Sequence, residues 1–286
     1  MDTPSRLQAG APDARQLNIP RHACRRPGNS VDSRMAKLPL ILVSASMEKR
    51  GVEFNDLSLS LSQRYEDALL NVGAIPLVAP ATVDRAVLAE AVRRTDGVLL
   101  TGGDDICPDL YATDLPADIR KTVGQTPDGG GRDLRELILI EEVFRQKKPL
   151  LCICRGHQLI NVAFGGGLIC DIRRQFSTQL NHQRSDKACE YVHDLALTPG
   201  SQIARITGTT TLGVNSSHHQ AVAETAEPFV ATGVSPDGLV EAMELRPGAA
   251  RLPYFLSVQF HPERLTPEHA EHRAIFTSFV KACKKR

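Results

Sequence analysis

Short apolar runs alternate with amphipathic segments along most of the chain, and this alternation predicts strands separated by helices. An apolar run bounded by turn residues is typical of a strand buried on both faces of a parallel sheet. Strands are predicted at residues 38–44, 74–78, 97–101, 149–153 and 254–260, and helices at 56–72, 83–94, 132–146 and 155–164. The pattern therefore indicates an α/β fold with a mostly parallel sheet that helices cover on both faces.

Three segments depart from this alternation. Residues 1–36 contain six arginines and few large apolar residues, so they are predicted to be a disordered extension before one domain at 37–286. Translation from Met35 is an alternative hypothesis for this extension. Residues 107–131 form a loop rich in Pro, Gly and Asp, and a loop of this length in a compact domain is often functional. Residues 168–245 are richer in strand than in helix patterns.

Cys154 stands where the apolar run at 149–153 ends and the next helix begins. Gly156 allows an abrupt turn into that helix, so the thiol is expected to stand clear of the sheet at a helix N-terminus. The free amides of a helix N-terminus favour a thiolate. This arrangement is the strand–nucleophile–helix turn that α/β hydrolases build around serine. The pattern therefore predicts that Cys154 is a catalytic nucleophile.

A base for this thiol is found about a hundred residues later, where the run at 254–260 ends in His261-Pro262-Glu263. Side chains two residues apart on an extended chain point the same way, so Glu263 is expected beside His261. Glu263 would hold one imidazole nitrogen and leave the other free for Cys154. The sequence thus predicts a triad of nucleophile, base and orienting carboxylate.

Five sequence blocks, in the same order, resemble a known family. The blocks Leu151–Gln158 and Val258–Glu263 resemble the class I glutamine amidotransferase superfamily. The blocks Asn161–Gly166, Asn215–Val222 and Ser235–Gly238 narrow the resemblance to the gamma-glutamyl-gamma-aminobutyrate hydrolase-like branch, the C26 cysteine peptidase family. The resemblance covers roughly residues 37–283. It implies a flavodoxin-like class I glutamine amidotransferase fold, in which 168–245 add a small antiparallel segment packed on the main sheet.

The resemblance also implies roles for residues around the triad. Acyl transfer creates an oxyanion that needs two aimed N–H donors, one of which should be the amide of Arg155, the residue after the nucleophile. The resemblance points to the Gly103 amide as the other donor. It places Gln158 at the glutamyl end of the substrate and Ser217-His218-His219 on the pocket wall, and it puts His182 and His193 near the pocket.

Several polar side chains have simpler interpretations. The Arg155 side chain is expected at the mouth of the site, either in a surface ion pair with Asp133 or Glu136 or in contact with a substrate carboxylate. His269 and His272 are expected to be solvated. The adjacent His218 and His219 suit a single metal poorly, and no Cys, Asp or Glu ligand set is evident around them. No metal and no cofactor is therefore expected.

Composition excludes several classes of function. A formal net charge of +1 gives no electrostatic case for nucleic acid or an anionic membrane. No apolar stretch approaches the length of about 18–20 residues that a transmembrane helix needs. The seven cysteines are odd in number and scattered, so a disulfide framework is not expected. Free thiols favour a reducing compartment, and a cytoplasmic location is expected.

Together these features predict a hydrolase of gamma-glutamyl amides that acts through a thioester on Cys154 and releases glutamate and an amine. The resemblance leaves the amine open: gamma-aminobutyrate and polyamines both fit. A glutaminase subunit of a two-chain amidotransferase is the alternative, and a non-catalytic binding protein is a third possibility that a complete triad disfavours. A small-molecule substrate is the expected partner, and a homodimer is expected by analogy alone.

Overall fold

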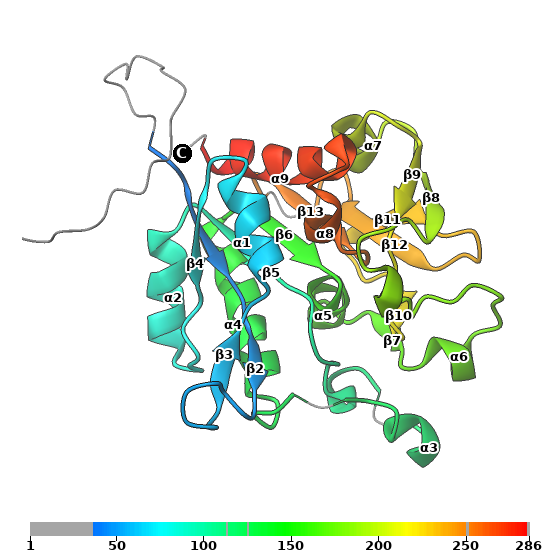
Figure 1. The fold of residues 1–286 in the computed structure, drawn as a ribbon, viewed down its shortest axis with the longest axis horizontal. Helices are drawn as coiled ribbons and strands as arrows, with labels where there is room; N and C mark the ends of the chain where they lie inside the picture. The colour runs from blue at the N-terminus through cyan, green and yellow to red at the C-terminus, as the bar shows by residue number, and fades with distance from the viewer. Residues whose placement is uncertain (1–36, 113, 125, 250–251, 285–286) are drawn as a thin grey trace, which may run out of the picture. The chain divides into compact units, whose positions relative to one another are not determined.

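The centre of the structure is one large sheet, whose parallel half lies where the sequence pattern predicts it (Figure 1). The computed structural model describes residues 37–112, 114–124, 126–249 and 252–284, so the prediction for residues 1–36 falls outside the described residues. The strand order is β4-β1-β5-β6-β13-β12-β11-β8-β9. The parallel strands are β1 (Leu40–Val43), β4 (Ile75–Val78), β5 (Gly97–Leu100), β6 (Leu150–Ile153) and β13 (Phe255–Val258).

The antiparallel half continues this sheet edge to edge. Its strands are β12 (Val240–Leu245), β11 (Phe229–Val234), β8 (His193–Leu197) and β9 (Thr211–Val214), and β10 (Ala221–Glu224) and β7 (Gly167–Ile169) pair beside them. β12 joins β13 antiparallel, with Ala242 opposite Val258. The predicted antiparallel segment is therefore present, but it extends the main sheet instead of packing on it. Backbone groups at the β13 edge are paired in this way, which spares the sheet an open edge.

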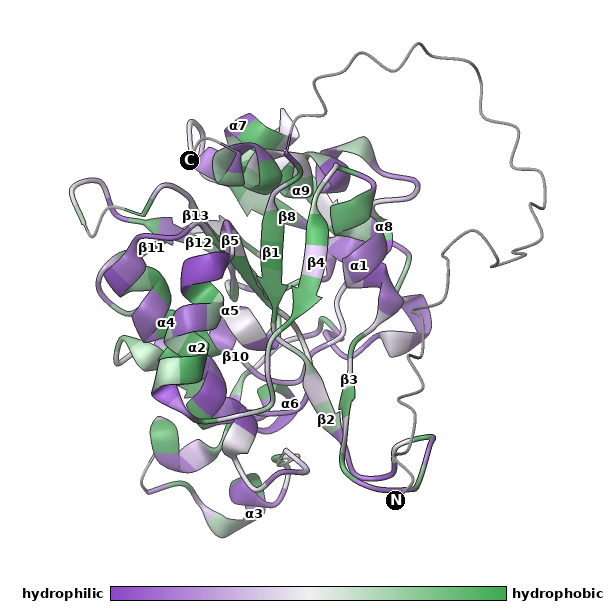
Figure 2. Ribbon diagram, turned by 90° about the vertical axis from the view of Figure 1, so that its left-hand side faces the viewer, coloured by the Kyte–Doolittle hydropathy of each residue, from purple (hydrophilic) through white to green (hydrophobic). Residues whose placement is uncertain are grey.

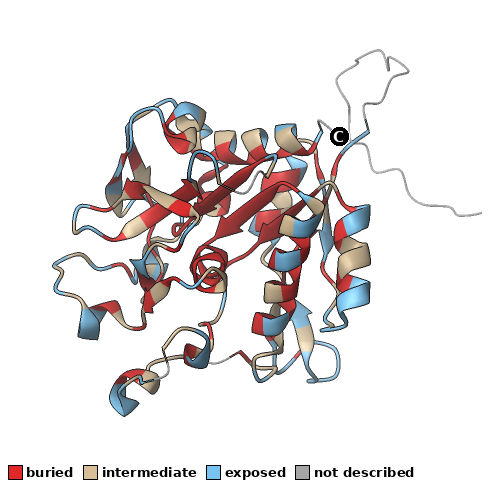
Figure 3. Cartoon of the chain, turned by 180° about the vertical axis from the view of Figure 1, so that it is seen from behind, coloured by how far each residue is buried: buried red, intermediate tan, exposed pale blue. Residues whose placement is uncertain are grey.

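Helices cover both faces of the parallel half, as predicted. Because side chains alternate along a strand, Ile41 and Val43 of β1 face one core cluster while Leu42 faces the other. The first cluster includes residues of α1 (Gln63–Leu70), α7 (Gln202–Thr207) and α9 (Ala270–Cys283). The second includes residues of α2 (Arg85–Arg94), α4 (Gly131–Gln146) and α5 (Arg155–Ala163). Figure 3 shows the resulting band of buried central strands.

Residues 56–72 differ from the prediction of one continuous helix. Ser58–Ser60 form strand β3, which pairs antiparallel with β2 (Ser46–Glu48), and α1 begins only at Gln63. The sequence from Asp56 to Leu61 alternates Leu with polar residues, which is a strand period and not a helical one. The Ser62 hydroxyl then accepts a hydrogen bond from the Arg64 amide and caps the helix. Figure 2 shows this hairpin, together with the apolar strands β1 and β4.

The long loop at 107–131 contains two short helices, η2 (Pro108–Leu110) and α3 (Ala117–Arg120). Three further short helices interrupt the strand-rich part or precede the last long helix: α6 (Ile172–Gln175), η3 (Ser185–Lys187) and α8 (Pro262–Leu265). Among the described residues, no helix combines the length and the apolar character needed to cross a bilayer. The carboxyl ends of β5, β6 and β13 meet at one edge of the sheet, where the predicted site residues follow them.

Candidate active site

Cys154 occupies a strained turn between β6 and α5. Its backbone has φ +51° and ψ −104°, a conformation that costs free energy in a non-glycine residue. Gly156 makes the turn possible, because a Cβ at that position would lie 2.7 Å from the carbonyl oxygen of Leu100 on β5. The strain and the close approach together hold the thiol at the sheet edge. This geometry matches the predicted nucleophile turn.

The amide of Arg155 is available to a ligand because helix α5 does not use it. The first hydrogen bond of this helix runs from the Gln158 amide to the Cys154 carbonyl oxygen at 3.1 Å. The amides before Gln158 lie in the first turn and have no acceptor within the helix. They form the positive end of the helix dipole next to the Cys154 sulfur.

His261 and Glu263 are in contact, with 2.8 Å between Nδ1 and Oε1. The contact was predicted on the assumption of an extended chain, and that assumption was wrong. Helix α8 begins at Pro262, so the chain here is not extended. Pro at the first helical position allows this early helix start, and the helix turn folds Glu263 back beside the ring. Asn215 fixes the backbone of His261 from the opposite side, accepting from its N–H at 2.8 Å and donating to its C=O at 3.0 Å.

The imidazole of His261 interacts with both Glu263 and Cys154. Burial lowers the pKa of His261, but the negative charge of Glu263 and the charge and hydrogen bond of Cys154 raise the pKa well above its usual value. Both side chains also converge on the backbone of Gly102, where a Cβ would lie 2.7 Å from His261 Cε1 and 3.5 Å from Cys154 Cβ. The thiol and the imidazole therefore share one side of the sheet edge. Only 13% of the His261 side chain is exposed.

Gly103 follows β5 and is held by Arg132. The Arg132 guanidinium donates to the carbonyl oxygen of Gly102 at 2.8 Å and to the Thr101 hydroxyl at 3.2 Å. Gly103 has φ +143°, and a Cβ here would collide with the Arg132 side chain, so only glycine fits. The Gly102 amide donates to the hydroxyl of Tyr65 at 2.9 Å. The loop that carries Gly103 is thus fixed on both sides.

The Arg155 side chain does not lie at the mouth of the site, contrary to expectation. It is 1% exposed and forms ion pairs with Asp133 and Glu136, and Arg132 pairs with Glu136 at 2.9 Å. We call Arg132, Asp133, Glu136 and Arg155 the arginine cluster. The predicted partners were correct, but the pairs are buried because α4 packs against α5. Burial raises the pKa of Glu136, but the two guanidinium groups outweigh it and leave that pKa below its usual value.

The comparisons with known proteins agree with this geometry. The Peptidase C26 family model matches residues 39–263. The chain belongs to the Peptidase C26 family. This membership identifies it as a hydrolase.

The C26 chain is 33% identical over 219 residues to Protein NtpR of Enterococcus hirae, a match that spans 76% of this chain and 87% of the relative. It is 30% identical over 234 residues to the gamma-glutamyl-gamma-aminobutyrate hydrolase PuuD of Escherichia coli, with 78% and 86% covered. A putative glutamine amidotransferase of Schizosaccharomyces pombe is 29% identical, with 78% and 82% covered.

A solved structure supports the fold of this C26 protein. A putative GMP synthase subunit from Thermoplasma acidophilum superposes with a TM-score of 0.57 at 16% identity, covering 86% of this chain and 95% of the other. This likeness confirms the predicted class I glutamine amidotransferase fold.

Two glutamines connect the nucleophile to the strand-rich half of the C26 domain. Gln158 donates to the Gln220 carbonyl oxygen and to Gln259 Oε1, both at 3.0 Å. Gln259 in turn lies 3.5 Å from Cys154 Sγ through its Nε2. Sequence reasoning missed Gln259, although it precedes His261 by two residues at the end of β13. The internal hydrogen bonds of Gln158 position the pocket wall, and its role at the glutamyl end of a substrate stays a prediction.

The three residues Ser217, His218 and His219 lie in two different environments, the surface and the buried interior. His219 pairs with Asp105 at 2.9 Å, two residues beyond Gly103, and it lines a surface cavity. Ser217 is hydrogen-bonded to Ser185 at 2.7 Å. His218 is buried and lies 3.8 Å from Glu241. The expectation that no acidic residue surrounds these histidines was wrong, because Asp105 and Glu241 come from distant parts of the chain.

The prediction that His272 is solvated was wrong. It is fully buried on α9, donates from Nε2 to the Gly213 carbonyl oxygen at 2.9 Å, and packs edge-on against Phe260. Burial lowers its pKa to about 4. His269, the residue before α9, is half-buried and lies 2.6 Å from the Tyr191 hydroxyl. The helical spacing of 272 with the apolar 276 and 279 is the signal that could have placed His272 in the core.

The cysteines other than Cys154 behave as structural or surface thiols within the described part of the chain. Cys152 is fully buried on β6, and burial raises the pKa of its thiol well above the usual value. Cys170 and Cys283 are buried as well, whereas Cys189 is exposed. No disulfide joins the six described cysteines, and Cys24 falls outside the described residues.

Proposed function

We propose that this chain hydrolyses gamma-glutamyl amides, with Cys154 as nucleophile, His261 as acid and base, and Glu263 as orienting carboxylate. The observation that carries the proposal is the convergence of Cys154 and His261 on Gly102, with Glu263 at 2.8 Å from the far nitrogen of the ring. The raised pKa of His261 supports an imidazolium in the resting enzyme, which is the form that can give a proton to the departing amine. Helix α5 adds its positive end at the same sulfur.

In the first half-reaction, Cys154 Sγ forms a bond to the gamma-carbonyl carbon of the substrate, and the carbonyl oxygen becomes an oxyanion. The amides of Gly103 and Arg155 are the proposed donors to this oxyanion. When the tetrahedral intermediate collapses, the C–N bond breaks and the His261 imidazolium gives its proton to the departing amine. The products of this step are a free amine and a gamma-glutamyl thioester on Cys154.

In the second half-reaction, neutral His261 takes a proton from water while the water oxygen adds to the thioester carbon. Collapse of this second intermediate breaks the C–S bond, releases glutamate and restores the thiolate beside the imidazolium. Glu263 keeps the Nδ1 proton in place during both steps, so that Nε2 faces the reacting atoms. Oxidants and reductants are not involved, because every step is a proton transfer or an acyl transfer.

The environment beyond His219 favours an amine that carries a carboxylate. A cavity of about 400 Å³ is lined by Thr122 of the loop at 107–131 and by Asp171, Arg173, Arg174, Gln183 and His219. The Asp171 carboxylate already caps α6 by accepting from the Arg174 amide, and Arg174 pairs with Asp118 at 3.6 Å. Arg173 is exposed, and its side chain bonds only the neutral amide of Asn181. We therefore propose Arg173 as the partner of a carboxylate on the leaving amine.

A panel of purified substrates tests the proposal. Glutamate release is followed with gamma-glutamyl-gamma-aminobutyrate, the gamma-glutamyl amide of a simple alkylamine, gamma-glutamylputrescine and glutamine. The expected order of kcat/KM places the carboxylate-bearing amide first and glutamine last. Preference for glutamine, with stimulation by a second protein, would instead support a glutaminase subunit. Absence of glutamate release from every substrate in the panel would overturn the proposal.

A further inference from the structure

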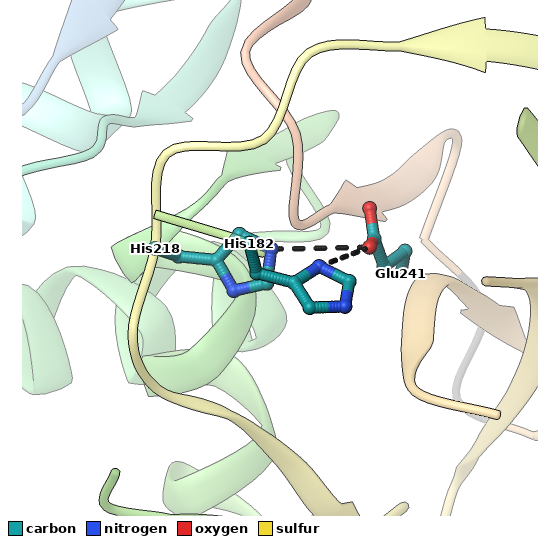
Figure 4. Close-up of side chains that lie close together, drawn as sticks. All are labelled: His182, His218 and Glu241. Atoms are coloured by element: carbon teal, nitrogen blue, oxygen red, sulfur yellow. Dashed lines mark ion pairs between the residues drawn. The ribbon is translucent and has the colours of Figure 1, made fainter. Parts of the chain in front are cut away.

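Three histidines and one glutamate meet in the buried interior of the strand-rich half, away from the triad. His182 comes from the segment after α6, His193 begins β8, His218 lies between β9 and β10, and Glu241 lies on β12. Their side chains are between 0% and 4% exposed. We call these four residues the histidine cluster. Figure 4 shows the rings of His182 and His218 directed at the Glu241 carboxylate.

The histidine cluster lacks hydrogen-bond partners at its centre. Neither carboxylate oxygen of Glu241 has a hydrogen bond of acceptable geometry, and the same holds for Nε2 of His218 and of His193. A buried polar atom without a partner costs about 1–3 kcal/mol, and more when it is charged. Four such atoms within one cluster indicate that a further binding partner belongs at this point.

The outward nitrogens of the two rings already have acceptors, so a neutral ring of His182 or His218 carries its proton on the outward nitrogen. His182 Nε2 lies 3.0 Å from Asp237 Oδ2, and His218 Nδ1 lies 2.9 Å from the Gln220 carbonyl oxygen. A neutral imidazole that donates from one nitrogen presents a lone pair at the other. The lone pairs of His182 Nδ1 and His218 Nε2 then face a carboxylate, and three electron-rich atoms repel each other unless a cation separates them.

The hydroxyl of Ser216 competes for His182 Nδ1. It lies 3.1 Å from His182 Nδ1 and 3.0 Å from the His182 carbonyl oxygen. Its single proton can be donated to only one of these atoms. Donation to the carbonyl oxygen leaves the Nδ1 lone pair available to a cation.

We infer that this interior is a Zn²⁺ site, with His182 Nδ1, His218 Nε2 and the Glu241 carboxylate as ligands. The ligand atoms all lie within 4.8 Å of one another, and Glu241 Oε1 is 3.5 Å from His182 Nδ1 and 3.8 Å from His218 Nε2. Ligands at the bond lengths of zinc, about 2.0–2.2 Å, are about 3.4 Å apart in a tetrahedral site. The nitrogen and oxygen donors and the compact geometry favour zinc over calcium or magnesium.

The surroundings of the three ligands match those of known metal sites. Ligating histidines usually donate their second N–H to a carboxylate or a backbone carbonyl, as His182 and His218 do here. Asp237 is itself fixed, because it accepts from the hydroxyls of Thr178 and Ser235. His193 Nε2 approaches Glu241 Oε1 at 3.1 Å and positions the carboxylate. A cavity of about 210 Å³, lined in part by His182 and His218, gives the ion an entry path.

Zinc at this point would have a structural role. It would join β12 and the segment after α6 to the loop before β10, whose Gln220 carbonyl oxygen also accepts from Gln158. The competing explanation is a protonated imidazole that balances Glu241 without a metal. The two explanations differ in an observable way, because only the first requires zinc in the protein.

The test uses the full chain, expressed with added zinc and purified without chelator. Elemental analysis is expected to find about one zinc per chain. After removal of the metal, ZnCl₂ at about 100 times its dissociation constant should raise Tm by roughly 5 °C or more. Co²⁺ should replace zinc and show the visible absorption of a tetrahedral site. Each readout is independent of catalytic activity, so the result stands whether or not the proposed hydrolysis is correct.

Two variants assign the ligands, and a neighbour serves as the matched control. Glu241→Gln and His218→Gln should each lower zinc affinity at least 100-fold, whereas His219→Gln, on the same loop but paired with Asp105, should keep the wild-type stoichiometry. Zinc-free protein whose Tm and Co²⁺ spectrum do not respond to added metal would overturn the inference. Equal zinc binding by wild type and both ligand variants would overturn it too. If a variant does not fold, the wild-type cobalt spectrum still decides.

Discussion

The arginine cluster and the histidine cluster both bury charge, but only in the first are the opposite charges joined by hydrogen bonds. Arg132 and Arg155 are matched by Asp133 and Glu136, and their ion pairs lie within α4 or between α4 and α5. In the histidine cluster, by contrast, Glu241 Oε1 lies 3.5, 3.1 and 3.8 Å from nitrogens of His182, His193 and His218 without a hydrogen bond to any of them. Buried charge has to be compensated in either case. From this difference we infer that the arginine cluster needs no further ligand and that the histidine cluster binds a metal ion.

The two clusters also differ in their relation to the proposed chemistry. The arginine cluster holds both proposed oxyanion donors, because Arg132 binds the carbonyl of Gly102 and the Arg155 side chain anchors the start of α5. The histidine cluster reaches Cys154 indirectly, through Gln220 and Gln158 to Gln259, and through the Glu241 carbonyl oxygen, which accepts from the Gln259 amide. Changes in the first should therefore alter both stability and turnover, and changes in the second should alter metal content first.

The largest expected effect concerns the nucleophile beside the arginine cluster. Cys154→Ser should lower kcat/KM for gamma-glutamyl-gamma-aminobutyrate by at least about 10³-fold, because a hydroxyl is a far weaker nucleophile than a thiolate. Steady-state glutamate release measures the effect. Cys152→Ala, two residues earlier on the same strand, is the control and should stay within several-fold of wild type. Comparable losses in both variants would point to a packing defect and not to lost chemistry.

Removing a carboxylate from the arginine cluster should give the largest loss of stability. Glu136→Gln leaves two buried guanidinium groups with only Asp133, and we expect the free energy of unfolding to fall by about 3–5 kcal/mol. Urea denaturation measures the change. Glu141→Gln on the same helix breaks an exposed pair with Arg85 and should cost less than about 1 kcal/mol. If the two variants are equally stable, the arginine cluster is not the balanced unit described above.

His272 tests what burial does to a histidine whose ring is hydrogen-bonded to an uncharged backbone carbonyl. Its pKa is about 4 in the folded protein because of burial, against about 6.5 when unfolded. Between these values only the unfolded chain binds the proton, so this contribution is fully present above pH 6.5 and is lost as pH falls toward 4. The free energy of unfolding should decrease by about 3 kcal/mol over this window.

Denaturant titrations at several pH values measure this dependence, and His272→Gln should remove much of it. Burial also lowers the pKa of His157 to about 4. Because His157 is present in both proteins, the difference between their pH dependences reports on His272. His269→Gln is the matched control at the neighbouring half-buried position. An unchanged pH dependence in His272→Gln would mean that this histidine does not stay neutral in the core.

The smallest effect is expected at Arg173. This arginine is exposed, and we propose that it binds a carboxylate of the substrate. Arg173→Gln should raise KM for the carboxylate-bearing amide about tenfold with little change in kcat, a loss of about 1.4 kcal/mol in binding. The gamma-glutamyl alkylamide should show no such change. A KM that rises equally for both substrates would remove Arg173 from recognition of the amine. Arg205→Gln, distant from the site on α7, controls for net charge.

The parallel half of the fold could be predicted because its signals are local. The parallel strands β1, β4, β5, β6 and β13 are short, largely apolar runs, and the helices between them have their own periodicity. The motifs around Cys154 and His261 lie directly at the ends of two such strands, so the topology brings them to one edge. The β2–β3 hairpin was missed because the Leu-Ser alternation at 57–61 was interpreted as the start of a helix.

The sequence by itself determined the strand–helix order, the nucleophile turn and the His261–Glu263 pair, because each depends on residues close together in the chain. Only the tertiary structure decided that Arg155 turns inward, that His272 is buried and that Glu241 meets His182 and His218. Those contacts depend on the packing of α4 on α5 and on the register of β12 against its neighbours. Linear spacing carries no information on such packing, since a shift of one residue along a strand would direct Glu241 to the opposite face.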